Sequence, residues 1–163
     1  MGFKLIVKGQ DSLSYGKEVI THVHVDVSTP SDSKAKSTDV AATMWVTGKL
    51  LSPGSGSSDT LGLFNWALVP AQSADAYRDV TVEVETSGAI FRKIDFPNAF
   101  VVDYNERYTD TAGVGEFALV LRQKADRVPQ VKADKGSSMG ELGGIGGGPG
   151  ISSVIDKYGT NDL

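Results

Sequence analysis

Hydrophobic and polar residues alternate along much of the chain, which is the pattern of β-strands with one buried face. In the clearest case, residues 79–86, valines alternate with threonine and glutamate. The same two-residue period separates the apolar side chains of residues 99–108 from Asp103, Asn105 and Arg107. The apolar face of that strand comprises Phe100, Val102, Tyr104 and Tyr108. The strand that follows it has Phe117, Leu119 and Leu121 on its apolar face. These stretches predict a meander of antiparallel strands.

Turn residues divide the rest of the chain into further strands. Ser87-Gly88 and Pro97-Asn98 are typical of corners between strands. Additional strands are predicted over residues 3–8, 18–28, 40–51 and 90–96. With about seven strands in total, the chain is predicted to be mainly β, folded as a barrel or a sandwich.

Residues 59–70, DTLGLFNWALVP, are the best helix candidate. Asp59 is a suitable N-cap, and Pro70 stops the helix from continuing. Apolar residues cover nearly the whole circumference, so the helix needs contacts on more than one side. Two arrangements stay open: the helix plugs its own barrel, or one side of it contacts a neighbouring subunit. Another partial helical turn is predicted between residues 71 and 79.

Composition narrows the class of protein. The 163 residues suffice for one core and an appendage. The net charge of -4, with scattered lysines and arginines, gives no general attraction for nucleic acid. The absence of cysteine excludes disulfides and a thiol nucleophile. No signal-peptide core is present, and no apolar stretch approaches the roughly 20 residues that span a bilayer. We therefore expect a cytoplasmic protein without membrane insertion.

Residues capable of catalysis or metal binding are few. His22, His24 and Asp26 alternate along one strand and share a face, but no further histidine or cysteine exists to complete a zinc shell. A polar strand face is the simpler interpretation. No acid–base pair or nucleotide-binding motif is recognisable. The sequence therefore predicts no enzyme activity, no cofactor and no metal site.

Several elements together are similar to the Hcp tube proteins (TssD) of type VI secretion systems. The order is a strand ending in TMWVTGKL, the helix LFNWAL, the strand VTVEVET and the long stretch FRKIDFPNAFVVDYNERYTDTAGVGEFALVLRQK. The similarity covers residues 3 to 127 and is greatest to the Bacteroidetes-type branch; phage tail-tube proteins are more distant relatives. The residues that match that branch's pattern are Phe96, Ala99, Phe100, Val101, Val102, Tyr104 and Glu106, followed by residues 117–124.

The resemblance implies an antiparallel β-barrel with one short flanking α-helix over residues 1–130. It also implies hexameric rings that stack into the hollow inner tube of a contractile injection or phage-tail-like system. Other copies of the chain would be the main partners, with sheath, spike and cargo proteins besides. Such a tube is assembled in the cytoplasm and can be exported as part of an injection particle. In the family, a long loop reaches the adjacent ring, and here that loop is residues 28–39.

Residues 131–163 depart from the family, because they form a glycine-rich extension with little periodicity. Glycine-rich composition is typical of flexible tails. The open alternatives are a disordered or cargo-like extension and a segment held by another copy. The candidate subunit-interface residues from the loop, the helix and the tail are Thr29, Pro30, Ser31, Asp32, Lys34, Lys36, Leu63, Trp66, Ile151, Ile155 and Tyr158.

Two other functional classes compete with the tube subunit. Trp45, Phe91 and Tyr108 suggest a monomeric β-sandwich that binds a peptide or glycan. The His22, His24 and Asp26 face suggests, more remotely, a metal-dependent hydrolase.

Overall fold

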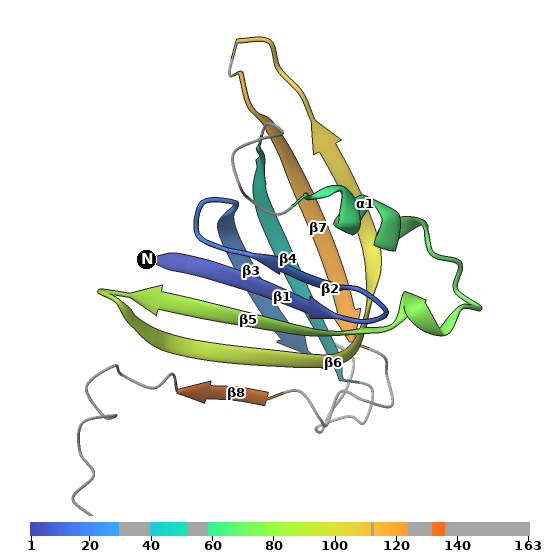
Figure 1. The fold of residues 1–163 in the computed structure, drawn as a ribbon. Helices are drawn as coiled ribbons and strands as arrows, with labels where there is room; N and C mark the ends of the chain where they lie inside the picture. The colour runs from blue at the N-terminus through green and yellow to red at the C-terminus, as the bar shows by residue number, and fades with distance from the viewer. Residues whose placement is uncertain (30–39, 52–58, 112, 124–131, 136–163) are drawn as a thin grey trace, which may run out of the picture.

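The computed structural model describes residues 1–29, 40–51, 59–111, 113–123 and 132–135. The elements are β1 (Gly2–Lys8), β2 (Ser12–Tyr15), β3 (Ile20–Ser28), β4 (Ala41–Leu50), α1 (Leu61–Leu68), η1 (Ala74–Ala76), β5 (Arg78–Thr86), β6 (Ala89–Arg107), β7 (Gly115–Gln123) and β8 (Lys132–Lys135). The strands belong to one antiparallel sheet with the order β2-β1-β5-β6-β7-β4-β3, and β8 pairs with β6 beside this path (Figure 1). This confirms the mainly β fold with one short α-helix.

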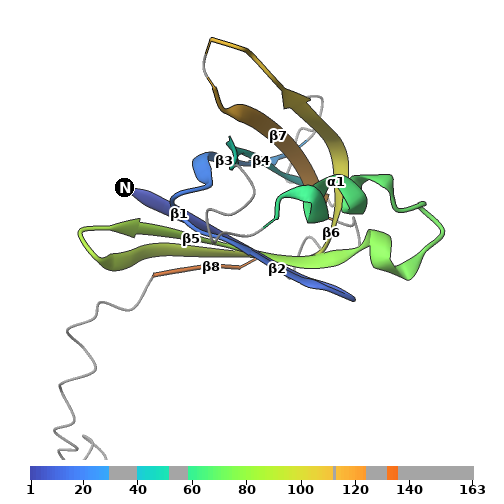
Figure 2. The ribbon, with the colours of Figure 1, turned by 45° about the horizontal axis from the view of Figure 1, so that its top comes forward.

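The long strand β6 joins two halves of the sheet. Its first part pairs with β5, and its second part, residues 99–107, pairs with β7. Figure 2 shows β6 bending from one half into the other. The bend lies near Asn98, whose φ of 54° is in the left-handed region that asparagine tolerates. The Asn98 backbone N–H donates to Asp79 Oδ1 at 3.0 Å. The predicted corner at Pro97-Asn98 is therefore a bend within one strand.

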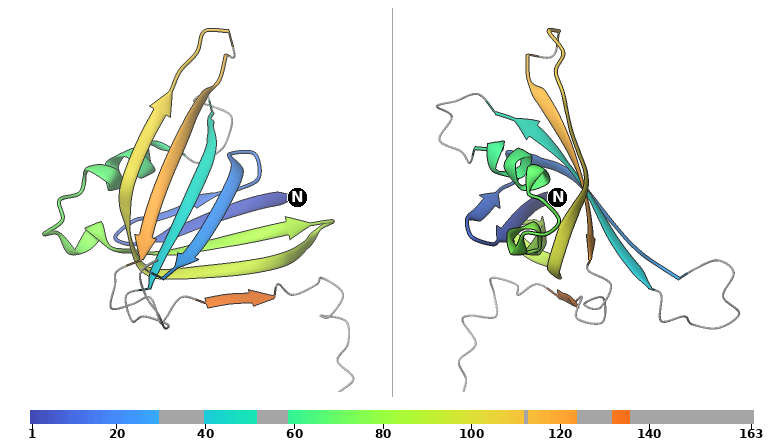
Figure 3. Two further views of the ribbon diagram at one scale, coloured as in Figure 1. Left: turned by 180° about the vertical axis from the view of Figure 1, so that it is seen from behind. Right: turned by 90° about the vertical axis from the view of Figure 1, so that its right-hand side faces the viewer.

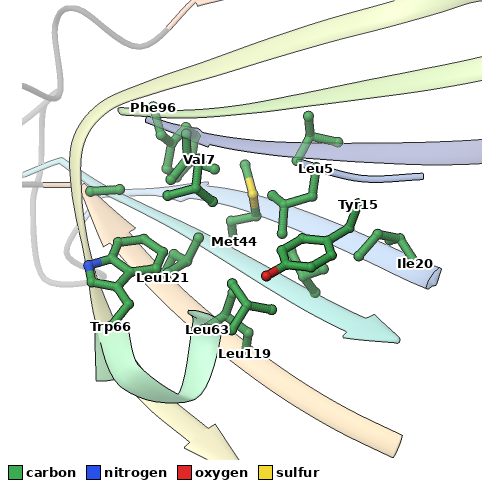
Figure 4. Close-up of a cluster of buried hydrophobic side chains, with 14 of the residues drawn as sticks. Leu5, Val7, Tyr15, Ile20, Met44, Leu63, Trp66, Phe96, Leu119 and Leu121 are labelled. Carbon is green, nitrogen blue, oxygen red and sulfur yellow. The ribbon is translucent and has the colours of Figure 1, made fainter. Parts of the chain in front are cut away.

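The sheet curls into an open barrel around an apolar core. β2 and β3 are the two ends of the strand path, and β1 approaches β3 across the core. Side chains from both halves and from α1 meet in this core (Figure 4). Its largest buried members include Tyr15, Met44, Leu63, Trp66, Phe96, Phe117, Leu119 and Leu121. The predicted inward positions of β7 are thus confirmed.

One predicted apolar face is wrong in part. A register irregularity lies between Val101 and Asp103 where β6 pairs with β7. Such a bulge inserts an extra residue and interrupts the two-residue period. As a result, Val102 is 43% exposed, and Phe100, opposite Arg122, lies on the other face from Tyr104, opposite Leu119. Tyr108, which the alternation also put on the buried face, lies just beyond the end of β6 and is 70% exposed.

The predicted helix is confirmed as α1. Asp59 Oδ1 accepts the Leu61 backbone N–H at 2.8 Å, so Asp59 caps the helix from one residue before the N-cap position, which Thr60 occupies. The predicted partial turn after Pro70 is η1. In the described part of the chain, no helix has the length and apolar character needed to cross a bilayer.

The strand β8 lies within the segment predicted as the glycine-rich extension. Its four residues pair with Arg92–Asp95 of β6, on the side of β6 opposite β5. Residues 132–135 of the extension are therefore part of the sheet, while residues 131 and 136–163 lie outside the described residues.

Candidate assembly surfaces

Two strand edges are open on the same half of the sheet. In the part of the chain that the structure describes, β3 pairs only with β4, and residues 100–107 of β6 pair only with β7. Between these edges the order is β6-β7-β4-β3, visible side by side in yellow, orange, teal and blue (Figure 3, left). An edge strand presents unpaired N–H and C=O groups that can pair with another chain. This four-stranded half can therefore be extended at both ends.

One face of the four-stranded half packs on the core, and no described element covers the other face (Figure 3, right). Residues that point outward follow the register across the strands. One such row is His24, Trp45, Val120 and Asp103. The next row is His22, Thr47, Ala118 and Asn105, and the last three of these residues line a hollow of about 280 Å³. We call this uncovered side the polar face.

The histidines of β3 lie on the polar face, as their alternation predicts. The His24 ring packs against the Trp45 ring, with centroids 5.0 Å apart and planes tilted by 53°. Among the described residues, no group of three or more histidine, aspartate or glutamate side chains is arranged to hold a metal ion. Packing against Trp45 gives His24 a structural role in shaping the polar face.

The helix α1 turns two sides to different surroundings. Leu63 and Trp66, which were candidate interface residues, are 0% and 2% exposed and belong to the core of their own chain. Their burial leaves these two side chains little surface for another subunit, and their place in a subunit interface stays a prediction. The side that remains available carries Leu61, Phe64 and Leu68, which are 53%, 39% and 66% exposed. The sequence separates these two sides at helical spacing but does not show which one is buried.

A groove lined by apolar side chains together with Asp103 and Tyr104 runs between α1 and the open edge of β6. It has a volume of about 250 Å³ and is lined by Phe64, Ala67, Leu68 and residues 101–104. The Phe64 and Tyr104 rings meet edge to face, with centroids 5.8 Å apart. We call this feature the α1–β6 groove.

Tyr104 and Tyr108 hold a carboxylate at the end of β6. The Tyr104 hydroxyl donates to Glu106 Oε1 at 2.7 Å, and the Tyr108 hydroxyl donates to Glu106 Oε2. Burial, together with the Glu106 carboxylate, raises the pKa of Tyr104. The same carboxylate also raises the pKa of Tyr108, so both phenols stay protonated and donate to Glu106 at the end of β6.

Trp66 connects α1 to the start of β5. Its Nε1–H donates to the Ala76 carbonyl at 3.1 Å, and the Arg78 guanidinium lies 5.3 Å from the ring centroid. Arg78 is only 6% exposed and donates through Nη2 to Asp75 Oδ2 at 2.6 Å. Because a buried guanidinium needs a partner, Asp75 fixes the whole connection.

We expect the Asp75→Asn variant to be less stable at neutral pH by roughly 1–3 kcal/mol, the range for losing a charge-assisted hydrogen bond. The hydrogen bond from Arg78 lowers the pKa of Asp75 below its ordinary value. A lowered pKa stabilises the fold above the unfolded-state pKa of about 3.9, and this stabilisation is lost as the pH falls through the folded-state pKa. The stability difference between wild type and variant should therefore shrink as the pH is lowered from 7 to 3 in urea denaturation.

The control for this prediction is Asp11→Asn, which removes an exposed carboxylate from the neighbouring turn. It should change stability by less than about 0.5 kcal/mol at neutral pH. A gap between wild type and Asp75→Asn that persists undiminished at pH 3 would show that the carboxylate charge is not what stabilises the connection.

Most of the loop and tail candidates lie outside the described residues. Thr29, which follows β3, is half-buried. The others are Pro30, Ser31, Asp32, Lys34, Lys36, Ile151, Ile155 and Tyr158. Their place in a subunit interface stays a prediction.

No protein-family model and no curated protein matches the sequence. Several solved structures share the fold. Hcp1 from Flavobacterium johnsoniae superposes with a TM-score of 0.52 at 16% identity, covering 76% of this chain and 90% of that chain. Hcp1 from the EAEC 042 pathovar of E. coli gives 0.51 at 10% identity, with 83% and 99% covered. A chain of the PVC sheath/tube terminator, from an extracellular contractile injection system, gives 0.50 at 14% identity, with 81% and 92% covered.

Proposed function

We propose that this chain, which has the Hcp-like tube-protein fold, is a structural subunit of a tube. Copies assemble into hexameric rings, and the rings stack into the hollow inner tube of a contractile injection or phage-tail-like system. The role is structural rather than enzymatic. The observation that carries it is the pair of open edges on one half of the sheet.

The strand directions allow these edges to join. Within one copy, β6, β7, β4 and β3 alternate in direction, because each neighbouring pair is antiparallel. Since the four-stranded half has an even number of strands, β3 of one copy meets β6 of the next in the antiparallel sense when the copies are related by rotation. The contact uses two different surfaces, so it is heterologous and closes into a ring when the rotation permits.

The shape of the subunit favours one side for the ring axis. The core side of the four-stranded half carries the bulk of the chain, including β1, β5 and α1, whereas no described element covers the polar face (Figure 3, right). When subunits that are thicker on one side join into a ring, the thinner side of each subunit faces the ring axis. The polar face, with His24, Trp45 and Asp103, then lines the channel.

Other proteins would meet the outer surface and ends of such a tube. A sheath outside it, a spike at its tip and cargo in its channel are the partners that this role requires. Assembly in the cytoplasm followed by export in an injection particle fits a tube that is driven outward. Neither nucleic acid nor membrane insertion belongs to this role.

Negative-stain electron microscopy of the purified protein at high concentration tests the assembly. We expect rings with a stain-filled centre, and stacks of rings at higher concentration. A matched sample truncated after Lys135 keeps β8 and removes residues 136–163. Rings without stacks in that sample would assign the glycine-rich tail to stacking. Uniform monomer-sized particles in the full-length sample would contradict the proposal.

A monomeric binding module is the second candidate, favoured by three exposed aromatic side chains. Trp45, Phe91 and Tyr108 are 36%, 54% and 70% exposed. They do not form one site, however, because Phe91 lies near the start of β6, Tyr108 just beyond its end, and Trp45 on β4. A peptide or glycan site needs convergent aromatic groups. The assembly role therefore accounts better for these surfaces.

A further inference from the structure

The α1–β6 groove carries several apolar side chains that no other described element covers. Leu68 and Val102, at its rim, are 66% and 43% exposed. Exposed apolar side chains that gather along a strand edge are typical of interaction sites. The open edge of β6 forms one wall of this groove, so a chain that pairs with β6 must also pass over it.

The strand β3 carries a row of valines that matches this groove. Val23, Val25 and Val27 alternate with the residues of the polar face and therefore point to the core side. Val23 and Val25 are half-buried against the core, while Val27 is 58% exposed. We call these three residues the valine row.

The register shows that the valine row and the groove lie on the same side of the sheet. Val25 is opposite Met44, Met44 is opposite Leu121, and Leu121 is opposite Val101. Val101 is one of the residues that line the groove. When a strand adds to an open edge, the two faces of the sheet continue across the new pair. The core side of an added β3 is therefore the side on which α1 lies.

We infer that the α1–β6 groove of one copy receives the valine row of a second copy. This contact rests on the proposed ring, and it adds a side-chain interlock to the backbone pairing of β3 with β6. Val27 covers Leu68 and Val102, and Phe64 closes over the half-buried valines. The exposed side of α1 is thus a subunit contact, in place of its Leu63 and Trp66 side.

Cross-linking through introduced cysteines tests the contact, since the natural chain has none. The double variant V27C/L68C should form a ladder of disulfide-linked chains on a non-reducing gel after mild oxidation. A mixture of the single variants V27C and L68C should give dimers only, because the contact is heterologous. In the pair V27C/N105C, the second cysteine lies on the polar face and outside the groove, so this pair should give no ladder.

A charge-reversal experiment gives a second measurement on the same contact. L68K alone and V27E alone should each raise the concentration needed for ring formation by about tenfold or more. Combined, V27E/L68K should recover most of that loss. L61K is the matched control, because Leu61 is a similarly exposed leucine of α1 that does not line the groove.

The outcomes separate this contact from the ring itself. Rings in the micrographs of the V27C/L68C protein, with neither a ladder nor recovery by the charge pair, would overturn the contact and leave the ring standing. A wild-type protein that stays monomeric would overturn both. A ladder from V27C/L68C, together with normal ring assembly of L61K, would establish that the valine row binds in the groove.

Discussion

Replacing Trp66 with alanine is expected to lower the free energy of unfolding by about 3–5 kcal/mol. The ring is 2% exposed and is the largest of the fully buried side chains. Its removal opens a cavity between α1 and the core, and it leaves the Ala76 carbonyl without its indole donor. Arg78 also loses the aromatic face against which its guanidinium lies. Guanidinium denaturation followed by far-UV circular dichroism measures the loss.

The second tryptophan provides the matched control. Trp45 is 36% exposed on the polar face, so Trp45→Ala should cost less than about 1 kcal/mol. Trp66→Phe should fall between the two alanine variants, because phenylalanine retains most of the buried apolar surface but donates no hydrogen bond. Equal losses for Trp66→Ala and Trp45→Ala would show that Trp66 does not anchor α1.

We expect Gly48→Ala to destabilise the fold by about 3 kcal/mol, at the upper end of the range for overpacking. A Cβ atom at Gly48 would lie 2.5 Å from Phe117 Cε1 and 2.6 Å from the Val19 carbonyl oxygen. Phe117 is 2% exposed and cannot swing into solvent. The Val19 carbonyl cannot retreat easily either, because it accepts the Lys49 N–H at 2.8 Å. Urea denaturation of the variant and the wild type checks this value.

A substitution at the adjacent position separates packing from a general strand effect. Lys49→Ala changes an exposed side chain of β4 and should alter stability by less than about 0.5 kcal/mol. If Gly48→Ala were as stable as Lys49→Ala, the close approach of Phe117 to the backbone of β4 would not hold in solution.

The sequence predicts those strands that have one face in the core and the other face toward solvent. In β5 and β7 every second residue enters the core, so Val80, Val82 and Leu119 reveal both the strand and its buried side. The helix is also predictable, because Asp59 and Pro70 mark its ends independently of its partners. These features depend on local periodicity and on turn chemistry, which a single sequence contains.

The features that depend on strand partners could not be predicted in this way. The extra residue at Val102 changes which face is buried, and nothing in the local pattern marks it. Nor does the period of α1 distinguish Leu63 from Leu61, since both sides are apolar. The open edges of β3 and β6 arise from strand order, which the resemblance to tube proteins implies but the periodicity does not.

The bend of β6 at Asn98 has a consequence for how the subunit comes apart. One continuous strand supplies hydrogen-bond partners to β5 on one half of the sheet and to β7 on the other. If either half of the sheet unfolds, β6 loses the hydrogen bonds that it makes there, and the other half depends on the same strand. We therefore expect the described domain to melt in a single cooperative transition, so that a subunit under mechanical load stays whole until it fails all at once.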